Sequence, residues 1–211
     1  MCIRDREMRV AIVHLTLNAL GGAERLCLDT LEALKLAGHE VSLITLEKTD
    51  WTLVEKGLGR FVKPDREIYS TLGALQERIS NEANALLVFA AYFFRLLSLQ
   101  SSKKYDLIIN TYGDLINSIA DLTYVHFPIR ATIEYSQFPP MTGITKWNIY
   151  CKIYGMLSHL IDQVNGGIIL TNSKFMRGVI RKFIHQDALV VYPPVDVEAF
   201  SQIKNPQKHN I

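Results

Sequence analysis

The chain lacks the sequence marks of several large protein classes. Its 211 residues include only three cysteines, which are widely spaced and form no CxxC pair. A zinc site or a disulfide framework is therefore not expected, and a reducing compartment fits the cysteine usage better. Neither a GxGxxG dinucleotide fingerprint nor a GxxxxGK[ST] phosphate loop occurs. These absences make a nicotinamide-dependent enzyme a poor fit.

Charge of one sign and long apolar runs are also scarce. The formal net charge is only +2, which argues against a dedicated nucleic-acid binder. The strongly apolar stretch 83–94 would form roughly 18 Å of helix, whereas a bilayer core needs about 30 Å, so it is not expected to span a membrane. No signal peptide is visible, because residues 1–7 are charged and lead into no cleavage site.

The composition that is present is that of an ordinary globular domain. Hydrophobic residues make up 48% of the chain and charged residues 21%. A chain of this length can bury a sizeable core without disulfides or a metal. We expect residues 1–7 to be a non-native leader, residues 8–195 to form one domain, and residues 196–211 to begin an interdomain linker.

Strand-like and helix-like segments alternate along the chain. Short β-branched runs predict strands at Val10–Leu15, Val41–Leu46, Tyr105–Asn110, Leu122–His126, Gly167–Thr171 and Leu189–Tyr192. Helical spacing predicts helices from Ala23 to a stop at Gly38, and over Glu82–Leu99, Leu115–Ala120, Thr145–Val164 and Ser173–Phe183. Residues 47–80 are expected to be loop-rich, with a short strand near Phe61. This alternation predicts the α/β class, with a Rossmann-like parallel sheet and helices on both faces.

Two adjacent glycines, Gly21 and Gly22, stand between the first expected strand and the first expected helix. Open α/β sheets bind ligands at the carboxyl ends of their strands, and a helix start carries unpaired N–H groups and roughly half a unit of positive charge. Glycine lets a phosphate approach those N–H groups without meeting a Cβ. A turn that needs positive φ explains the pair equally well, so both interpretations stay open.

Other polar residues are expected at the same edge of the sheet. His126 ends an expected strand, and a histidine there can form a hydrogen bond to a ligand or move a proton near neutral pH. His14 ends the first strand, and a structural role is expected for it. Asn172 or Ser173 is expected to cap the helix that follows. The basic side of that helix is expected either to be solvated or to rest on anionic lipid; it is formed by Lys174, Arg177, Arg181 and Lys182.

Three stretches resemble family-4 glycosyltransferases with the GT-B fold, especially the mannosyltransferases that extend lipid-linked oligosaccharides. The first is GGAERLCLDTLEALKLAGHEVSLIT, beginning at Gly21. The second is YVHFP, Tyr124–Pro128, and the third runs from ILTNSKFMRGVIRKF to VVYPPVDVEAF, Ile169–Phe200. The three stretches occur in the order and at the separations expected of that family, and the resemblance covers roughly residues 8–200.

The resemblance implies a retaining transferase whose nucleotide-sugar donor, GDP-mannose or a UDP-sugar, lies between two Rossmann-like domains. It implies that Gly21 and Gly22 lie beside the donor diphosphate, with Gly22 closer. Arg25 is expected either to pair with a donor phosphate or to be a solvated surface residue. His126 is then the catalytic candidate, which holds the sugar and stabilises the transition state. Further donor contacts are expected from Asn172 and Ser173. No metal is expected to hold the diphosphate, and the chain has no DxD motif.

The resemblance also implies a second, donor-binding domain that this chain does not contain, so we expect a fragment that folds but transfers little or no sugar. The acceptor is expected to be a glycan or a lipid-linked saccharide, and no nucleic acid is expected as a partner. We expect a cytoplasmic location, free or peripheral on the cytoplasmic membrane face. The helix over 83–97 is then either buried or in contact with the membrane. The alternatives are a non-catalytic partner subunit and a nucleotide-binding oxidoreductase or epimerase.

Overall fold

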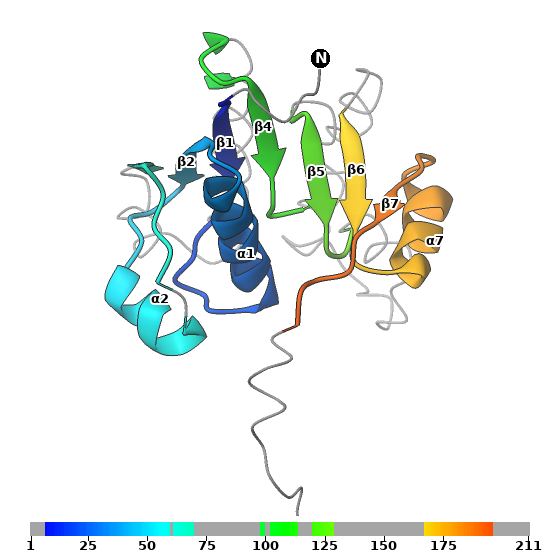
Figure 1. Cartoon of the computed structure of the whole chain (residues 1–211). Coiled ribbons are helices and arrows are strands. Elements are labelled where there is room, and N and C mark those ends of the chain that lie inside the picture. Colours follow the sequence, from blue (N-terminus) through cyan, green and yellow to red (C-terminus); the bar gives the residue numbers. More distant parts are fainter. Residues whose placement is uncertain are drawn as a thin grey trace, which may run out of the picture.

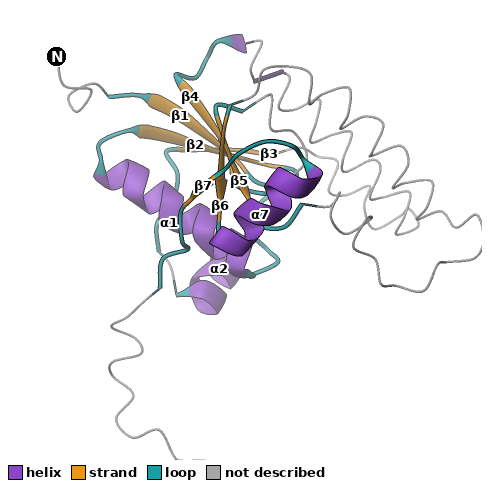
Figure 2. Cartoon of the chain, turned by 90° about the vertical axis from the view of Figure 1, so that its right-hand side faces the viewer, coloured by secondary structure: helices purple, strands orange, loops and turns teal. Residues whose placement is uncertain are grey.

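The computed structural model describes residues 7–59, 61–69, 98–99, 102–113, 120–128 and 167–195. These residues form a seven-stranded sheet in the order β3-β2-β1-β4-β5-β6-β7, and all neighbouring strands run parallel (Figure 1). In the side view of Figure 2, helix α1 runs alongside the strands and α2 lies below it. The predicted α/β class with a Rossmann-like parallel sheet is confirmed.

Most elements lie where the sequence predicted them. The strands are β1 (Arg9–Val13), β2 (Glu40–Thr45), β3 (Arg66–Tyr69), β4 (Leu107–Asn110), β5 (Leu122–Val125), β6 (Ile168–Thr171) and β7 (Leu189–Val190). The helices of the described residues are α1 (Gly22–Leu36), α2 (Trp51–Leu58) and α7 (Lys174–Phe183). The predicted helix over Thr145–Val164, and nearly all of those over Leu115–Ala120 and Glu82–Leu99, lie outside the described residues.

The prediction of a loop-rich segment over residues 47–80 is wrong in its first half. Helix α2 forms there because the Asp50 carboxylate accepts the N–H of Leu53 at 3.1 Å and Gly59 ends the helix with φ 63°. Only two turns long, it shows too little periodicity to stand out in the sequence. The strand expected near Phe61 is β3, which begins five residues later at Arg66.

The order of strands reverses between β1 and β4. From β1 the chain moves outward to β2 and β3, and it then returns to the other side of β1 to form β4. Strand β1 is therefore covered by a neighbour on each side, and its residues Val10 to Val13 are buried. Ligands of open α/β sheets bind beside the carboxyl ends of strands at such a reversal point. The residues that follow β1 and β4 are the first candidates for a site.

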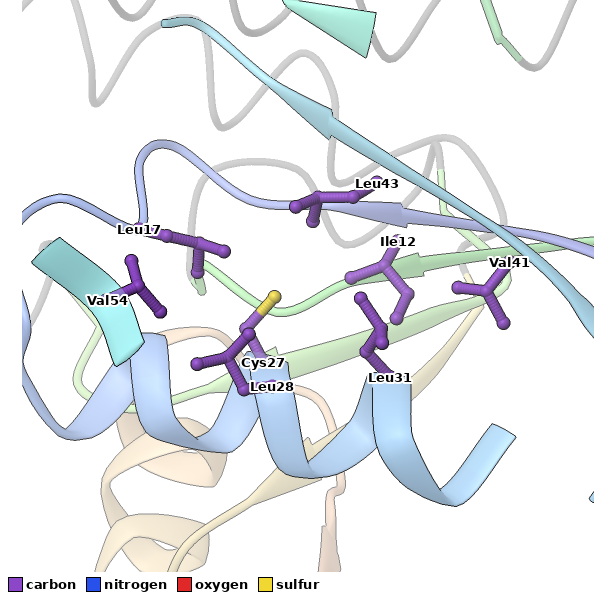
Figure 3. Close-up of a cluster of buried hydrophobic side chains, with 8 residues drawn as sticks. All are labelled: Ile12, Leu17, Cys27, Leu28, Leu31, Val41, Leu43 and Val54. Carbon is purple, nitrogen blue, oxygen red and sulfur yellow. The ribbon is translucent and has the colours of Figure 1, made fainter. Parts of the chain in front are cut away.

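The core lies against α1. Figure 3 shows Cys27, Leu28 and Leu31 of this helix facing Ile12 of β1 and Leu43 of β2. All of these side chains are fully buried, and burying a leucine contributes about 1.5–3 kcal/mol. This packing holds the start of α1 at a fixed place beside the sheet. A second buried cluster joins α7 to β5 and β6; it consists of Val125, Ile169, Ile180, Ile184 and Ala188.

Aspartate side chains close the amino edge of the sheet. Each one accepts the backbone N–H of a residue at the start of a neighbouring strand, which fixes the register of the two strands. The pairs are Asp106 with Arg9 at 2.9 Å, Asp65 with Val41 at 2.8 Å, and Asp121 with Ile108 at 2.7 Å. The opposite, carboxyl edge carries histidine, threonine, asparagine and glycine instead.

Candidate functional site

All six site residues predicted from the sequence lie at the carboxyl edge of the sheet. Gly21, Gly22 and Arg25 belong to the start of α1, which follows β1. His126 comes directly after β5, and Asn172 and Ser173 come directly after β6. The fold therefore brings together, at one edge, residues that are up to 152 positions apart (from Gly21 to Ser173).

The start of α1 has open backbone N–H groups. Gly21 is the N-cap, and the N–H of Arg25 makes the first helical bond to its carbonyl at 3.1 Å. The Gly21 N–H donates to Oε2 of Glu24 at 2.7 Å. This bond is half of a capping box, and glycine has no side chain with which to complete it. Within the described residues, the N–H groups of the first helical turn consequently receive no side-chain cap.

The two glycines meet different surroundings. A Cβ at Gly21 would lie 2.7 Å from Oε2 of Glu24, whereas a Cβ at Gly22 would have nothing within 4 Å. Gly21 has φ −93°, and neither glycine is among the positive-φ residues; the left-handed residue of this turn is Leu20, with φ 57°. A need for positive φ therefore does not explain the glycine pair. The open backbone at Gly22 is consistent with close approach of an anion.

His14 is buried between α1 and β4. Its Nδ1 lies 2.9 Å from Oγ1 of Thr111, and its Nε2 lies 3.5 Å from Oε1 of Glu24. The Thr111 hydroxyl donates its hydrogen to the carbonyl of Val13 at 3.3 Å, so Nδ1 of His14 is the donor to Thr111. Nε2 donates to Glu24, so both ring nitrogens of His14 carry a hydrogen. His14 is therefore an imidazolium paired with a carboxylate.

Charge and burial compete at this pair. Burial lowers the pKa of His14, but Cys27 and Glu24 together outweigh it and raise the pKa to about 9. The hydrogen bond with His14 in turn lowers the pKa of Glu24. His14 is completely buried and Glu24 is 5% exposed, so each needs the other to remain charged. The structural role expected for His14 is present in these contacts, and it extends to the start of α1.

His126, unlike His14, is a neutral imidazole. A carbonyl oxygen can only accept, so Nε2 of His126 donates to the carbonyl of Thr111 across 3.1 Å. Burial lowers the pKa of His126, which keeps the ring neutral and its Nδ1 an acceptor. The ring lies 5.0 Å from that of Tyr124, whose hydroxyl donates to the carbonyl of Val191 at 2.7 Å. A neutral histidine in this state can accept a hydrogen bond from a sugar hydroxyl.

Asn172 and Ser173 have separate structural functions. Ser173 is the N-cap of α7, and its Oγ accepts the N–H of Met176 at 3.1 Å, which confirms the predicted cap. Asn172 instead donates through Nδ2 to the carbonyl of His126 at 3.1 Å, so it joins the end of β6 to the end of β5. Their contacts with a donor stay a prediction.

The basic residues of the site region divide into two groups. Arg25 is partly buried, and its Nε has no hydrogen-bond partner in the part of the chain that the structure describes. Its contact with a phosphate stays a prediction. On α7, Arg177 and Arg181 each form two hydrogen bonds with Asp187, at 2.7–2.9 Å. These bonds lower the pKa of Asp187, so two of the four basic side chains of α7 already have an anionic partner.

Neither a metal centre nor a membrane span is found among the described residues. No three His, Cys, Asp or Glu side chains gather there in a way that could hold a metal ion. The helices of the described ranges are also too short or too polar to cross a bilayer. The helix predicted over 83–97 lies outside these ranges, so its burial or membrane contact stays a prediction.

Sequence reasoning missed Thr111. It follows β4 as His126 follows β5, and its two oxygen atoms contact both histidines of the site. Its position after a buried strand was the available signal, since residues at strand ends of one sheet edge gather together. For Glu24, the sequence predicts no more than a favourable charge near the start of a helix. It lies in the first turn of α1 as expected, but its bonds to Gly21 and His14 were not foreseen.

Curated relatives of the chain are mannosyltransferases, and no protein-family profile matches it. The chain is 27% identical over 202 residues to Alpha-1,3/1,6-mannosyltransferase ALG2 of Kluyveromyces lactis, covering 91% of this chain and 38% of that protein. The ALG2 protein of Dictyostelium discoideum is 24% identical over 217 residues, covering 98% and 49%. A GDP-Man:Man(3)GlcNAc(2)-PP-Dol alpha-1,2-mannosyltransferase of Dictyostelium discoideum is 32% identical over 95 residues, covering 44% of this chain and 18% of that protein.

The chain thus spans less than half the length of these relatives. The resemblance to glycosyltransferases, and to mannosyltransferases among them, is confirmed by these similarities. Among solved structures, an alpha-glucosyltransferase in complex with UDP-glucose and DNA containing an abasic site aligns with a TM-score of 0.43 and 13% identity. The alignment covers 93% of this chain and 46% of that one.

Proposed function

We propose that this chain, a relative of mannosyltransferases, forms the N-terminal domain of a retaining GT-B glycosyltransferase. The enzyme would transfer a sugar, with mannose favoured, from a nucleotide-sugar to a glycan or lipid-linked acceptor. The similarity to ALG2 proteins over 91–98% of the chain supports this assignment. The second domain of such an enzyme would supply the remaining donor contacts.

The open start of α1 is the observation that carries the proposal. It lies at the carboxyl edge, next to the point where the strand order reverses, which is the usual ligand site of an open α/β sheet. Its first-turn N–H groups lack a side-chain cap, and the space above Gly22 is open. A diphosphate at this helix end would gain hydrogen bonds and a favourable dipole, and Gly22 presents no side chain to it.

His126 would contact the transferred sugar. Its ring is neutral and its Nε2 is already committed to Thr111, so Nδ1 can accept a hydrogen bond from a sugar hydroxyl. Such a contact orients the sugar while the leaving diphosphate gains stabilisation from the N–H groups of α1. In this mechanism His126 positions the sugar and is not the nucleophile.

The acceptor and the location follow from the same proposal. A lipid-linked acceptor would bring the enzyme to the cytoplasmic face of a membrane. Residues 83–97 would then contact lipid, and the basic side of α7 would rest on anionic head groups. Contact of these residues with vesicles can be measured by sedimentation.

A ligand titration tests the proposed donor site. Thermal shift and calorimetry would compare GDP-mannose, UDP-glucose, UDP-N-acetylglucosamine and NAD on the chain and on Gly22→Val. We expect one nucleotide-sugar to bind weakly and Gly22→Val to abolish the binding, because the valine side chain covers the N–H groups of α1. Stabilisation by NAD alone, or equal binding by Gly22→Val, would overturn the proposed donor site.

The chain offers a matched control for this substitution. Gly178 lies in α7 and is exposed, and a Cβ added there, as at Gly22, would have nothing within 4 Å. Gly178→Val therefore introduces the same side chain at an equally open helical position away from the glycine pair. It should leave the binding of the nucleotide-sugar unchanged.

A further inference from the structure

The start of α1 is connected to the buried side of the sheet edge by a continuous series of hydrogen bonds. The Gly21 N–H donates to Oε2 of Glu24, and the other oxygen of this carboxylate faces Nε2 of His14 at 3.5 Å. Nδ1 of His14 then donates to the Thr111 hydroxyl, which donates to the carbonyl of Val13. Each hydrogen bond in the series has a definite donor and acceptor, and these assignments are compatible with one another.

Resting on the donor site proposed above, we propose that His14 and Glu24 together position the Gly21–Gly22 backbone for a diphosphate. Glu24 holds the Gly21 N–H turned toward the protein, so the following N–H groups are the ones that face an anion. His14 supplies the positive charge that allows this carboxylate to remain beside a bound anion. Neither side chain need touch the ligand, so both are positioning residues.

The charge of Glu24 alone would work against the site. A carboxylate next to a proposed diphosphate repels it, and the low dielectric of a buried position strengthens that repulsion. His14 is the cation closest to Glu24 among the described contacts, since its ring nitrogen is 3.5 Å from the carboxylate. The other titratable groups coupled to this pair are Cys27 on α1 and His126 after β5. A cysteine side chain is never a cation, and burial lowers the pKa of His126, so neither group replaces the positive charge of His14.

Substitution by glutamine separates geometry from charge. The Oε1 of Glu24→Gln can still accept from Gly21, and its amide can donate to a neutral His14, so the hydrogen bonds are kept without the ion pair. Glu24→Ala removes both the bond to Gly21 and the charge. His14→Gln removes the cation together with the ring's bond to Thr111, and it leaves the carboxylate of Glu24 without a positively charged partner. The double variant His14→Gln/Glu24→Gln removes both charges together.

The experiment follows the backbone amides of the ¹⁵N-labelled chain by NMR while inorganic pyrophosphate is added. Hydrogen exchange of the Gly21 amide reports its bond to Glu24, and the Gly22 and Ala23 amides report anion binding. We expect Glu24→Ala to accelerate exchange at Gly21 and to weaken pyrophosphate binding about tenfold. His14→Gln should weaken binding by a similar factor while Gly21 stays protected. The double variant should recover most of the lost affinity.

A control substitution distinguishes positioning from general stability. Asp121 accepts the N–H of Ile108 at 2.7 Å, the same kind and length of bond that Glu24 makes to Gly21, but at the amino edge. Asp121→Ala should lower the stability of the chain and leave pyrophosphate affinity unchanged. If it weakens binding as much as Glu24→Ala does, affinity merely follows stability and the inference is overturned.

The remaining outcomes separate the two proposals. If pyrophosphate shifts the Gly22 amide equally well in the chain and in both Glu24 variants and His14→Gln, the donor site stands and the positioning role is overturned. If pyrophosphate does not shift the Gly22 and Ala23 amides of the unsubstituted chain, the proposed donor site is wrong and the positioning role falls with it. Recovery of pyrophosphate binding in the double variant supports both the donor site and the positioning role.

Discussion

The backbone carbonyl of Thr111 accepts a hydrogen bond from Nε2 of His126 at 3.1 Å. The hydroxyl of the same threonine accepts one from Nδ1 of His14 at 2.9 Å. One residue at the end of β4 therefore orients two imidazoles, one whose pKa is raised to about 9 and one whose pKa is lowered. The site thus contains a charged and a neutral histidine with fixed donors and acceptors.

Replacing Thr111 by valine should destabilise the chain by about 1–2 kcal/mol, because it leaves Nδ1 of buried His14 without an acceptor. Urea unfolding measures the change. Thr123→Val is the matched control: Thr123 is also buried, and its hydroxyl has no hydrogen-bond partner in the described ranges. The control should be neutral or slightly stabilising. Equal losses in the two variants would contradict the role assigned to the Thr111 hydroxyl.

Stability should fall as the pH rises from 6.5 to about 9. The folded pKa of His14 is raised from 6.5 to about 9, so its contribution is complete below pH 6.5 and is lost as the pH approaches 9. Since the shift is large, the loss should be on the order of a few kcal/mol. Urea unfolding at several pH values measures it, and His14→Gln should remove the slope. An unchanged slope in that variant would show that another group titrates.

Below pH 6.5 the protonation of Glu24 and His126 determines how the stability of the chain changes with pH. Glu24 has a lowered pKa, so its contribution is present above its ordinary value of 4.5 and is lost as the pH falls further. The pKa of His126 is also lowered, and the unfolded chain therefore binds a proton at this residue before the folded chain does. Stability should consequently decrease below pH 6.5, and His126→Ala should make that decrease smaller.

Alanine at the two adjacent glycines should have different effects on stability. Gly21→Ala places a Cβ 2.7 Å from Oε2 of Glu24, so the carboxylate must move and its bond to the Gly21 N–H is strained. We expect a loss of about 1–2 kcal/mol in thermal or urea unfolding. Gly22→Ala enters open space at the first helical position and should be neutral or slightly stabilising. A reversed order of the two effects would contradict the geometry described for this turn.

His126→Ala should remove the part of donor affinity that depends on the sugar. The quantity to measure is the ratio of the dissociation constants of GDP and GDP-mannose, by calorimetry. We expect the variant to lower this ratio about fivefold to tenfold, because one hydrogen bond to a sugar hydroxyl is lost. Tyr124→Phe keeps the neighbouring ring and removes only a hydroxyl bonded to Val191, so it should leave the ratio unchanged. An unaffected ratio in His126→Ala would remove this residue from the sugar site.

Ser173→Ala tests whether this residue does more than cap a helix. Loss of the cap should cost about 1 kcal/mol, and Asp50→Ala, which removes the cap of α2, should cost a similar amount. The two caps are comparable, since each accepts a backbone N–H at 3.1 Å. If Ser173 also contacts the donor, only Ser173→Ala should weaken nucleotide-sugar binding. Equal binding by both variants would limit Ser173 to capping.

The sequence predicted those parts of the fold that depend on local pattern. Strands such as β1 and β2 are buried β-branched runs, and each is long enough to be distinguished from its surroundings. Helix α2 was missed because its two turns show little periodicity, and it is held in place by capping at Asp50 and by burial of Val54. Tertiary contacts decide such short elements, and a local pattern does not report them.

The same division applies to the candidate site. The location of Gly22, His126 and Ser173 at one edge could be predicted, because each comes after an expected strand and the carboxyl ends of parallel strands share one edge. The contacts among His14, Glu24 and Thr111 could not be found in this way. His14 and Thr111 are 97 residues apart, and only the pairing of β1 with β4 brings them together. Their protonation states depend on that burial, which no local sequence feature reveals.

The aspartates at the amino edge bear on how this fold tolerates mutation. Because Asp106 and Asp121 fix strand register from the end of the sheet opposite to the candidate site, part of the strand alignment is independent of the loops at the carboxyl edge. Insertions or substitutions in those loops can then be sampled by evolution without a shift of the sheet. A descendant of this chain could change what binds at the carboxyl edge while it inherits the scaffold intact.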